Sequence, residues 1–214
     1  MSIAIDRPAT EITRKRYQRL SRFYDSMETL SESRRSVWRE KLWAKVRGPH
    51  ILVVGVGTGK NIPYWPIDSM ITAIDLTPGM LAHAVRRATA LGRKANLCLG
   101  DVQSLDFPSA SFETAVATCV FCSVPDPVLG LRELARVVRK DGQVLLLEHM
   151  RSSNPAAGRL MDLLNPFIVR MMGANINRRT LDNVHAAGLI VTDVQNLDQL
   201  GIFRLITASP PAMV

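Results

Sequence analysis

The sequence predicts an α/β fold, with a doubly wound, mostly parallel sheet of seven strands and an amphipathic helical arm before it. Short aliphatic runs alternate with helical patterns through the middle of the chain. Turns rich in glycine and acidic residues follow the first three of these runs, and the first 48 residues are basic and helical in pattern. Continuous aliphatic runs are typical of parallel strands that are buried on both faces.

Length and composition favour one globular domain with a substantial core. The chain has 214 residues, of which 47% are hydrophobic and 21% charged, so disorder throughout is excluded. No apolar run approaches the roughly 20 residues that a membrane-spanning helix needs. The start of the chain lacks the apolar stretch of a secretory signal, and 3 cysteines do not make a disulfide framework. We therefore expect a soluble protein of the reducing cytosol.

Residues 1–48 are predicted to form a basic amphipathic helical arm. They hold 12 Lys and Arg against 6 Asp and Glu, which accounts for most of the net charge of +8. Large apolar residues from Ile12 to Met27 recur at helical spacing, with basic residues on or beside the opposite side. Basic amphipathic helices with aromatic residues are typical of binding at a membrane interface. We expect this helix to bind an anionic membrane surface; the alternative is that it docks on the core.

A second apolar stripe lies further along the arm, among basic residues. Its members are Val37, Trp38, Leu42, Trp43 and Val46. For this stripe, docking on the protein's own core is the favoured interpretation. Residues 49–214 are then predicted to form the main domain.

Seven runs of residues are predicted to be strands. Five aliphatic runs end at polar or glycine-rich turns: residues 51–54, 71–74, 95–99, 114–120 and 144–147. Two further runs, residues 190–197 and 202–208, are predicted to form an antiparallel pair at the end.

Helical patterns separate these strands. Residues 77–91 begin with Thr and Pro and stop at Gly92, and residues 127–139 are amphipathic and stop before a glycine turn. A later stretch, residues 160–172, has Leu, Met and Phe at helical spacing. This pattern predicts a core helix, and a second membrane-facing or acyl-chain surface is the alternative.

A glycine loop directly follows the first predicted strand. Gly55, Gly57 and Gly59 alternate with Val56 and Thr58. Close-spaced glycines permit positive φ and let the backbone approach a ligand. The spacing excludes a Walker A loop and departs from G-x-G-x-x-G, because the third glycine comes one residue early.

Two carboxylates follow the next two strands. Asp75 can accept hydrogen bonds from the ribose of a nucleoside, or it can cap the helix that follows. Asp101 follows Gly100, and together with Gln103 it could read an adenine edge or simply turn a loop. Because the carboxyl ends of successive parallel strands meet at one edge of the sheet, the loop and both acids predict one nucleoside pocket.

This combination of glycine loop, Asp75 and Gly100-Asp101 resembles the class I S-adenosylmethionine-dependent methyltransferases, over about residues 50–208. The resemblance implies a Rossmann-like methyltransferase fold with S-adenosyl-L-methionine as cofactor. It implies that the loop flanks the methionine part, Asp75 holds the ribose, and the region of Asp101 meets the adenine. The cofactor-binding residues implied are Gly55, Gly57, Gly59, Asp75, Leu76, Met80, Asp101, Val102 and Cys119. One departure is Val53, where the family commonly has an acid that orients the sulfonium end.

Other details are similar to small bacterial phosphatidylethanolamine N-methyltransferases, which resemble the ubiquinone and menaquinone C-methyltransferases. These details are Arg22-Phe23-Tyr24-Asp25, Lys60-Asn61 and Glu148-His149. The implied activity is successive methylation of the lipid amine toward phosphatidylcholine, by a protein bound peripherally to the cytoplasmic face of the membrane. A quinone C-methyltransferase is the runner-up. A non-catalytic lipid-binding module is the alternative outside the enzymes; the departure at Val53 keeps it open.

The chemistry of a lipid amine directs attention to a few side chains. A primary amine with a pKa near that of lysine, about 10.4, is protonated at neutral pH and must lose a proton before attack. His149 is the first candidate for the base or for positioning the amine, and Tyr24 is the second. Glu148 is predicted to favour the cationic product, or to cap the strand end. Arg178 and Arg179 are predicted to bind the lipid phosphate, or to be solvated charges.

Neither nucleic acid nor metal is expected as a partner. The stretch 118–123 lacks the Asp/Asn-Pro-Pro-aromatic pattern that is usual in enzymes that methylate base amines. Cys119 and Cys122 form a lone C-x2-C with one further cysteine, which does not make a zinc site.

Overall fold

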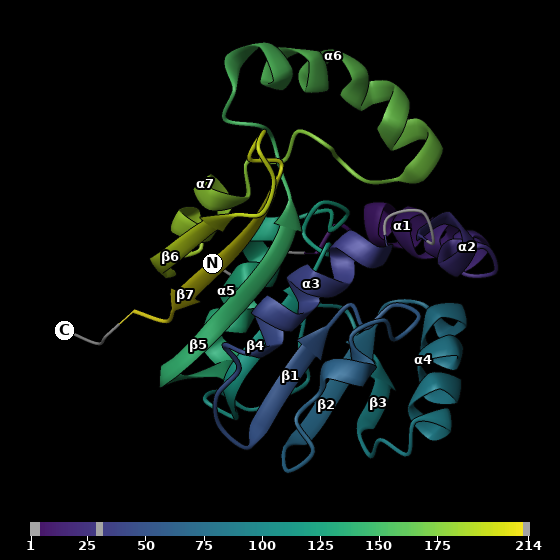
Figure 1. The fold of residues 1–214 in the computed structure, drawn as a ribbon, viewed down its shortest axis with the longest axis vertical. Helices are drawn as coiled ribbons and strands as arrows, with labels where there is room; N and C mark the ends of the chain where they lie inside the picture. Colours follow the sequence, from purple (N-terminus) through teal and green to yellow (C-terminus); the bar gives the residue numbers. More distant parts are fainter. Residues whose placement is uncertain (1–4, 29–31, 212–214) are drawn as a thin grey trace.

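The fold is built on a central sheet, seen in a computed structural model that describes residues 5–28 and 32–211. Its seven strands lie in the order β3-β2-β1-β4-β5-β7-β6 (Figure 1). They are β1 His50–Val54, β2 Met70–Asp75, β3 Asn96–Leu99, β4 Phe112–Thr118, β5 Val138–His149, β6 Ile190–Asn196 and β7 Phe203–Ser209. The first five strands pair in parallel, and β7 is antiparallel to both β5 and β6. The predicted sheet is thereby confirmed.

Helices pack on both faces of this sheet, each with its own hydrophobic cluster. One cluster joins α5 (Pro127–Val137) and α7 (Thr180–Ala186) to the sheet. The other joins α3 (Glu32–Trp43), α4 (Pro78–Ala90) and the short 3-10 helix η2 (Ile62–Tyr64) to the opposite face. Since strand residues alternate between the two faces, Leu52 and Val54 enter the first cluster while Ile51 and Val53 enter the second. The middle strands are thus buried on both sides, as their aliphatic composition predicts.

The boundary between α5 and β5 differs from the prediction. The helix ends at Val137, two residues before the predicted helix end, and β5 already begins at Val138. Val138 pairs with Phe112, but the next pair joins Gln143 to Thr114, so the intervening residues bulge out of the ladder. Val prefers extended backbone, and the partner strand β4 fixes it there.

Among the described residues, three α-helices precede the sheet: α1 (Arg7–Leu20), α2 (Tyr24–Glu28) and α3. The second apolar stripe docks on the core as expected, because Trp38, Leu42 and Trp43 of α3 are buried in the second cluster. Residues 1–4 and 29–31 of the predicted arm lie outside the described residues. Figure 1 shows α1 and α2 beyond the carboxyl ends of the central strands, where a ligand of this fold class is bound.

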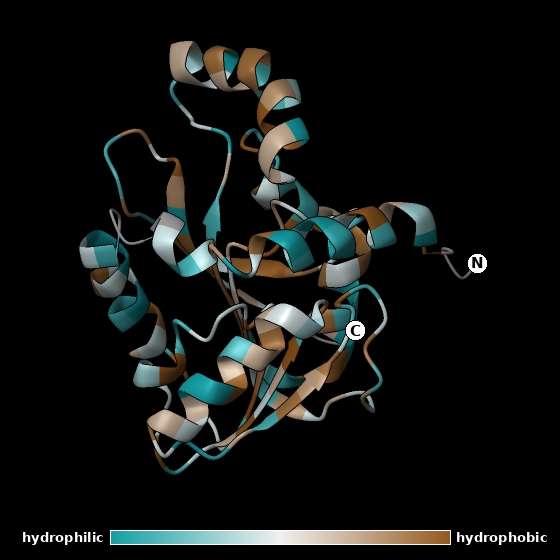
Figure 2. Cartoon of the chain, turned by 90° about the vertical axis from the view of Figure 1, so that its right-hand side faces the viewer, coloured by the Kyte–Doolittle hydropathy of each residue, from teal (hydrophilic) through white to brown (hydrophobic). Residues whose placement is uncertain are grey.

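Helix α6 (Pro155–Met172) departs most from expectation, because it projects away from the sheet (Figure 1) and belongs to neither cluster. Of its apolar side chains, Met161 is buried. The exposed ones are Leu160, Leu163, Leu164, Phe167, Met171 and Met172, and Figure 2 shows the hydrophobic colour along this helix. The prediction of a core helix is wrong, because periodicity identifies an apolar face but not what covers it. Within the described ranges, no helix is long and apolar enough to cross a membrane.

Candidate active site

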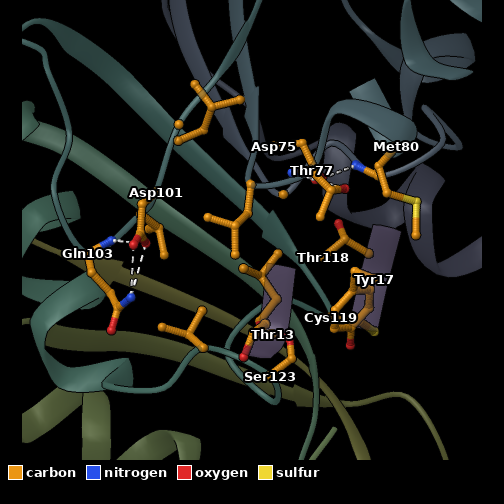
Figure 3. A pocket seen from close by; sticks show the side chains of 18 of the residues that line it. Thr13, Tyr17, Asp75, Thr77, Met80, Asp101, Gln103, Thr118, Cys119 and Ser123 are labelled. Carbon is orange, nitrogen blue, oxygen red and sulfur yellow. Dashed lines mark hydrogen bonds between the residues drawn. The ribbon is translucent and has the colours of Figure 1, made fainter. Parts of the chain in front are cut away.

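A pocket opens where the turns after β1, β2, β3 and β4 meet, beneath α1 (Figure 3). We call it the nucleoside pocket. Its walls include eight of the nine predicted cofactor residues: Gly55, Gly57, Asp75, Leu76, Met80, Asp101, Val102 and Cys119. The sequence argument that strand ends share one edge therefore brings these residues together, although their role in binding the cofactor stays a prediction.

Asp75 is the most constrained polar group of the pocket. The residue is 7% exposed, and burial raises the pKa of its carboxyl while hydrogen bonds from Thr77 and Gly57 act in the opposite direction. Its Oδ1 accepts from the backbone N–H and the hydroxyl of Thr77, each at 2.9 Å, and its Oδ2 accepts from the N–H of Gly57 at 2.9 Å. Since each carboxylate oxygen can accept more than one hydrogen bond, Oδ2 can also accept from a ribose hydroxyl. The same residue orients the glycine loop and the start of α4.

Asp101 and Gln103 form a second polar wall, shown with their hydrogen bonds in Figure 3. The Nε2 of Gln103 donates to both oxygens of Asp101, at 3.1 and 3.0 Å, and to the hydroxyl of Thr10 at 3.0 Å. Its Oε1 accepts from the N–H of Asp126 at 3.0 Å. The amide of Gln103 is therefore engaged at both ends, and its function here is to fix Asp101 and α1 rather than to read a base edge.

Gly59 is the predicted cofactor residue that does not line the pocket. A Cβ at this position would lie 2.5 Å from Cδ1 of Ile62 and 3.1 Å from Cα of Ala84, and φ is +84°. Glycine is required here so that the loop can pack against α4. Gly57 differs, because a Cβ there would meet no atom within 4 Å. The glycine loop therefore has one residue open to the ligand side and one that serves packing.

Cys119, in the turn after β4, has a left-handed backbone with φ of 54°, which is uncommon for a residue other than glycine. Its N–H donates to the carbonyl of Leu147 at 2.8 Å, which holds the turn in place. Strained backbone of this kind costs on the order of 1 kcal/mol and is concentrated at ligand sites.

Helix α1 forms the roof of the nucleoside pocket, which the sequence did not predict. Thr13 and Tyr17, one helical turn apart, both line the pocket (Figure 3). Burial raises the pKa of Tyr17, and its hydroxyl is hydrogen-bonded with Ser123. The Oε1 of Gln18 accepts from the N–H of Gly79 at 2.8 Å and ties the roof to α4. Tyr17 belongs to the apolar stripe that was predicted to bind a membrane, but it faces the pocket. Its spacing from Thr13 places both residues on one face of the helix, which is the only sign of this role in the sequence.

Tyr24 and Asp25 of α2 lie beside α1 on the same side of the nucleoside pocket. Tyr24 lines the nucleoside pocket, and Asp25 hydrogen-bonds the hydroxyl of Thr58 in the glycine loop and the guanidinium of Arg87 in α4, the latter at 2.6 Å. Burial raises the pKa of Asp25, but the hydrogen bonds from Thr58 and Arg87 outweigh it, so the pKa is lowered overall. Asp25 therefore fastens α2, and with it Tyr24, across the loop.

A second pocket adjoins the first; we call it the cationic pocket. The two share Tyr24, Gly55, Gly57, Thr118 and Cys119. The cationic pocket is further lined by Arg35, Trp38, Arg39, Val56, Thr58, Lys60, Asn61, Leu147 and Phe203. It therefore continues from the methionine side of the predicted cofactor site toward α3.

His149, the first candidate for the base, lines neither pocket. Its ring packs edge-on against Phe203, with centroids 5.1 Å apart. Burial first, and then the charge of Arg35, lowers the pKa of His149, so its imidazole is neutral at neutral pH. The structure thus brings Tyr24, but not His149, to the junction of the two pockets.

Glu148 is buried beneath the nucleoside pocket, with 0% exposure. Its Oε1 accepts from the N–H groups of Val120 at 2.9 Å and Phe121 at 3.2 Å, which shapes the turn after β4. Burial raises the pKa of Glu148 to about 7, against the lowering effect of these N–H groups. A carboxyl in this position supports the pocket wall and does not reach a substrate, unlike the substrate-binding role predicted for it.

The two predicted phosphate ligands also line neither pocket. Arg178 donates to the carbonyl of Val124 at 2.8 Å, and burial lowers its pKa. Arg179 is exposed, with 69% of its side chain accessible and Asp182 4.0 Å away. No cluster of three or more His, Cys, Asp or Glu that could hold a metal ion occurs in residues 5–28 and 32–211.

Comparisons with known proteins identify the family. Residues 52–146 match a family described as a methyltransferase domain. The chain is 35% identical over 144 residues to a phosphatidylethanolamine N-methyltransferase of Cereibacter sphaeroides. The aligned residues cover 66% of this chain and 70% of that protein. The chain belongs to the S-adenosylmethionine-dependent methyltransferases.

This methyltransferase has other relatives in both sequence and structure. It is 29% identical over 174 residues to a ubiquinone/menaquinone biosynthesis C-methyltransferase of Bdellovibrio bacteriovorus, covering 78% of this chain and 74% of that protein. Its fold matches geranyl diphosphate methyltransferase in complex with SAM, with a TM-score of 0.67 at 16% identity, over 82% of this chain and 85% of that one.

The cofactor of the methyltransferase is S-adenosyl-L-methionine, and the nucleoside pocket fits it. A buried carboxylate at Asp75 retains an acceptor position, Asp101 lies on the opposite wall, and the backbone at Gly57 is open to close approach. Met80, Val102 and other apolar side chains supply the surface on which a nucleoside base can pack. Val53 lies in the core at 2% exposure, so the acid common at this position has no counterpart there.

Proposed function

We propose that this methyltransferase N-methylates phosphatidylethanolamine, in successive transfers toward phosphatidylcholine, at the surface of an anionic membrane. One observation carries the proposal. The strand ends that line the nucleoside pocket lie at the same end of the molecule as α1 and α6 (Figure 1). Both helices present residues suited to a lipid surface.

Helix α1 and the turn after it contribute charge and apolar anchors. Lys15, Arg19 and Arg22 are exposed, as are Ile12 at 57% and Phe23 at 65%. Each basic side chain near an anionic bilayer contributes about 1 kcal/mol of attraction. An enzyme held there peripherally would reach a lipid headgroup from the cytoplasmic side.

Helix α6 supplies a larger apolar face beside α1. The two helices meet where the side chain of Arg16 packs against Gly173 at the end of α6. The exposed Leu, Phe and Met residues of α6 stand beside the exposed cations Arg159 and Arg170, a composition typical of interfacial helices. The alternative predicted for this stretch, a second membrane-facing surface, is therefore part of the proposal.

The nature of the relatives supports a lipid amine as the acceptor. The phosphatidylethanolamine N-methyltransferase is the more identical of the two relatives described, at 35% against 29%. A quinone precursor is the second candidate, favoured by the larger share of this chain, 78%, that the C-methyltransferase covers. Both acceptors lie in membranes.

The chemistry requires the protein to supply position and a proton acceptor. S-adenosylmethionine supplies an activated methyl group, so the chain's own residues must orient the amine, exclude water and remove its proton. Tyr24 is the favoured side chain for orienting the amine and sharing its proton, because it lines both pockets. His149 is neutral and can accept a proton, but it lines neither pocket.

A parallel assay of acceptors tests the proposal. The protein is incubated with methyl-labelled S-adenosylmethionine and, separately, phosphatidylethanolamine vesicles, a demethylated quinone or RNA. Label in the phospholipid is the expected result; label only in the quinone would favour the second candidate. No label in any acceptor, with retained vesicle binding, would favour the lipid-binding module.

Membrane binding is tested with matched charge variants. Lys15→Gln with Arg19→Gln on α1 should weaken co-sedimentation with anionic vesicles, and added salt should weaken wild-type binding. The control, Lys94→Gln with Lys140→Gln, removes the same charge from exposed sites near the amino ends of the strands. Co-sedimentation of this control with anionic vesicles should not weaken. Equal loss in both variants would show attraction by net charge alone and would overturn the role of α1.

A further inference from the structure

We propose that an apolar groove beside the cationic pocket binds an acyl chain of the phospholipid acceptor. This inference rests on the proposed function and adds a substrate subsite to it. The groove lies between α3 and the connection from β6 to β7, residues 197–202, and we call it the acyl groove. Its apolar lining consists of Trp38, Leu197, Leu200, Ile202 and Phe203. Its volume of about 580 Å³ lies within the usual range of ligand sites.

The polar groups of the connection bond one another, so the groove presents mainly side-chain carbon. The Oδ1 of Asp198 accepts from the N–H groups of Leu200 at 2.8 Å and Ile202 at 3.1 Å, and its Oδ2 accepts from the N–H of Phe203. The carbonyl of Leu200 accepts from the hydroxyl of Ser152. Since these groups are engaged within the protein, the groove is suited to hydrocarbon, which needs no hydrogen bonds.

The acyl groove lies at the end of the molecule that we propose to face the membrane. His149 at the end of β5 pairs with Phe203 at the start of β7, so the connection stands beside the carboxyl end of β5. Figure 1 shows this connection, in yellow, beside the segment that leads from β5 to α6, and Ser152 of that segment bonds Leu200. Leu200 is 49% exposed. An acyl chain drawn from a bilayer on this side therefore has an apolar surface to lie on.

The groove adjoins the cationic pocket, and the order of the sites follows the order of groups in the lipid. Trp38 and Phe203 line both cavities, and their rings pack with centroids 4.8 Å apart. The cationic pocket in turn joins the nucleoside pocket at Tyr24, Gly57 and Cys119. In phosphatidylethanolamine the amine is followed by an ethylene linker, the phosphodiester, glycerol and the acyl chains. With the amine at the junction of the first two pockets, an acyl chain extends toward the groove.

An apolar site for the chain removes a cost of bringing the headgroup to the cofactor. The headgroup must leave the bilayer surface to reach the junction, and its chains are drawn partly out of the hydrocarbon with it. Each methylene left in water would weaken binding by about fourfold. A methylene that moves from the bilayer into the acyl groove stays out of water, so that loss is avoided.

The isoprenoid tail of a quinone is the competing occupant. That tail is attached to the ring that receives the methyl group, so it would begin at the junction and run through the cationic pocket before it reached the groove. The cationic pocket has polar lining there, including Thr58, Lys60 and Asn61. A phosphodiester and glycerol suit this intervening stretch better than hydrocarbon does, which favours the phospholipid.

Monomeric lysophosphatidylethanolamines with hexanoyl, octanoyl or decanoyl chains test the inference without a membrane. The KM for methylation should fall with chain length, by up to about fourfold per methylene, and should fall much less in Leu200→Asp. Leu91→Asp is the matched control, because Leu91 is similarly exposed, at 46%, and does not line the groove. Leu200→Met keeps an apolar side chain and should restore the dependence, and thermal unfolding checks that each variant is folded.

Fluorescence quenching locates the chain without any methylation. Decanoyl lysophosphatidylethanolamine that carries bromine near the end of its chain should quench tryptophan emission, with S-adenosylhomocysteine present. Trp38→Phe should remove most of this quenching, because Trp38 lines the groove. Trp65→Phe is the matched control, since Trp65 is buried and lines none of the three cavities. Leu200→Asp should also weaken the quenching.

Three results would overturn the inference. The first is a KM that ignores chain length or falls equally in wild type and Leu200→Asp. The second is quenching that is absent, or that is equal in wild type and Trp38→Phe. The third is a dependence on Leu200 for a prenylated quinone alone, with no quenching by the brominated lipid, which would assign the groove to a quinone tail.

Failure of the proposed function gives a different pattern. If the wild type methylates no phosphatidylethanolamine, quenching by the brominated lipid still tests the groove: its loss in Trp38→Phe and Leu200→Asp supports the site, and its absence in the wild type refutes it. If phosphatidylethanolamine is methylated but the KM is the same for all chain lengths, the function stands and the acyl groove is refuted.

Discussion

Replacing Glu148 with Gln should remove a large pH dependence from the stability of the fold. Glu148 is fully buried, and burial raises its pKa from 4.5 to about 7. The folded chain therefore holds this proton more tightly than the unfolded chain, so the stabilisation is complete below the unfolded pKa and is lost as pH rises through the folded one. At about 1.4 kcal/mol per pKa unit, the full effect is about 3 kcal/mol, of which about 2 kcal/mol falls between about pH 5.5 and 8.

Urea unfolding at several pH values between about 5.5 and 8 measures this slope. The wild type should lose about 2 kcal/mol over that range relative to Glu148→Gln. Glu113→Gln is the control. Burial raises the pKa of Glu113, but hydrogen bonds, those from His50 among them, outweigh it, so the pKa is lowered and the carboxyl is ionised throughout. His149, whose pKa is lowered, gives a change of opposite sign, but it is common to all three proteins. Parallel curves for wild type and Glu148→Gln would refute the assignment of a buried, protonated carboxyl.

Three further predictions concern the pocket and its closure. Asp75→Ala should weaken S-adenosylhomocysteine binding by tenfold or more in calorimetry, since a charge-assisted bond and the support of Gly57 are lost together; unchanged affinity would remove the ribose assignment. Asp25→Asn should cost no more than about 1 kcal/mol of stability, because the pair with Arg87 is partly exposed, yet it should speed proteolysis within residues 5–28. Gly59→Ala should destabilise the fold by about 1–3 kcal/mol in urea unfolding, with cofactor affinity per folded molecule unchanged, because its Cβ would clash with Ile62.

The sheet and the nucleoside pocket follow from local patterns, which explains why the sequence predicts them well. Each strand is a short aliphatic run ended by a turn, and parallel pairing places all carboxyl ends at one edge. Asp75 and Asp101 need no further information to be brought together. Gly59 shows the limit of this reasoning, because its position in the motif does not tell whether a glycine faces the ligand or the neighbouring helix.

The surfaces that residues of α1 to α3 contact are harder to predict from the sequence, because these contacts join residues that are distant in the chain. The apolar stripe of α1 is divided: Tyr17 turns into the pocket while Ile12 remains exposed. Helical periodicity cannot separate these cases, since it gives the direction of a side chain around the axis and not the surface opposite it. For the same reason the exposed face of α6 was only the alternative interpretation of its apolar pattern.

This division between local and distant contacts also separates the cofactor site from the surfaces that we propose for the acceptor. The matched methyltransferase domain spans residues 52–146 and contains the glycine loop, Asp75 and Asp101. The roof of the nucleoside pocket and the arginines of the cationic pocket come from residues 13–39, before that region, and the apolar helix α6 follows it. A chain can therefore keep the cofactor site and change its acceptor by altering only the flanking helices. For this reason substitutions in α1 to α3 and α6, rather than in the glycine loop, should change the choice between a lipid amine and a quinone.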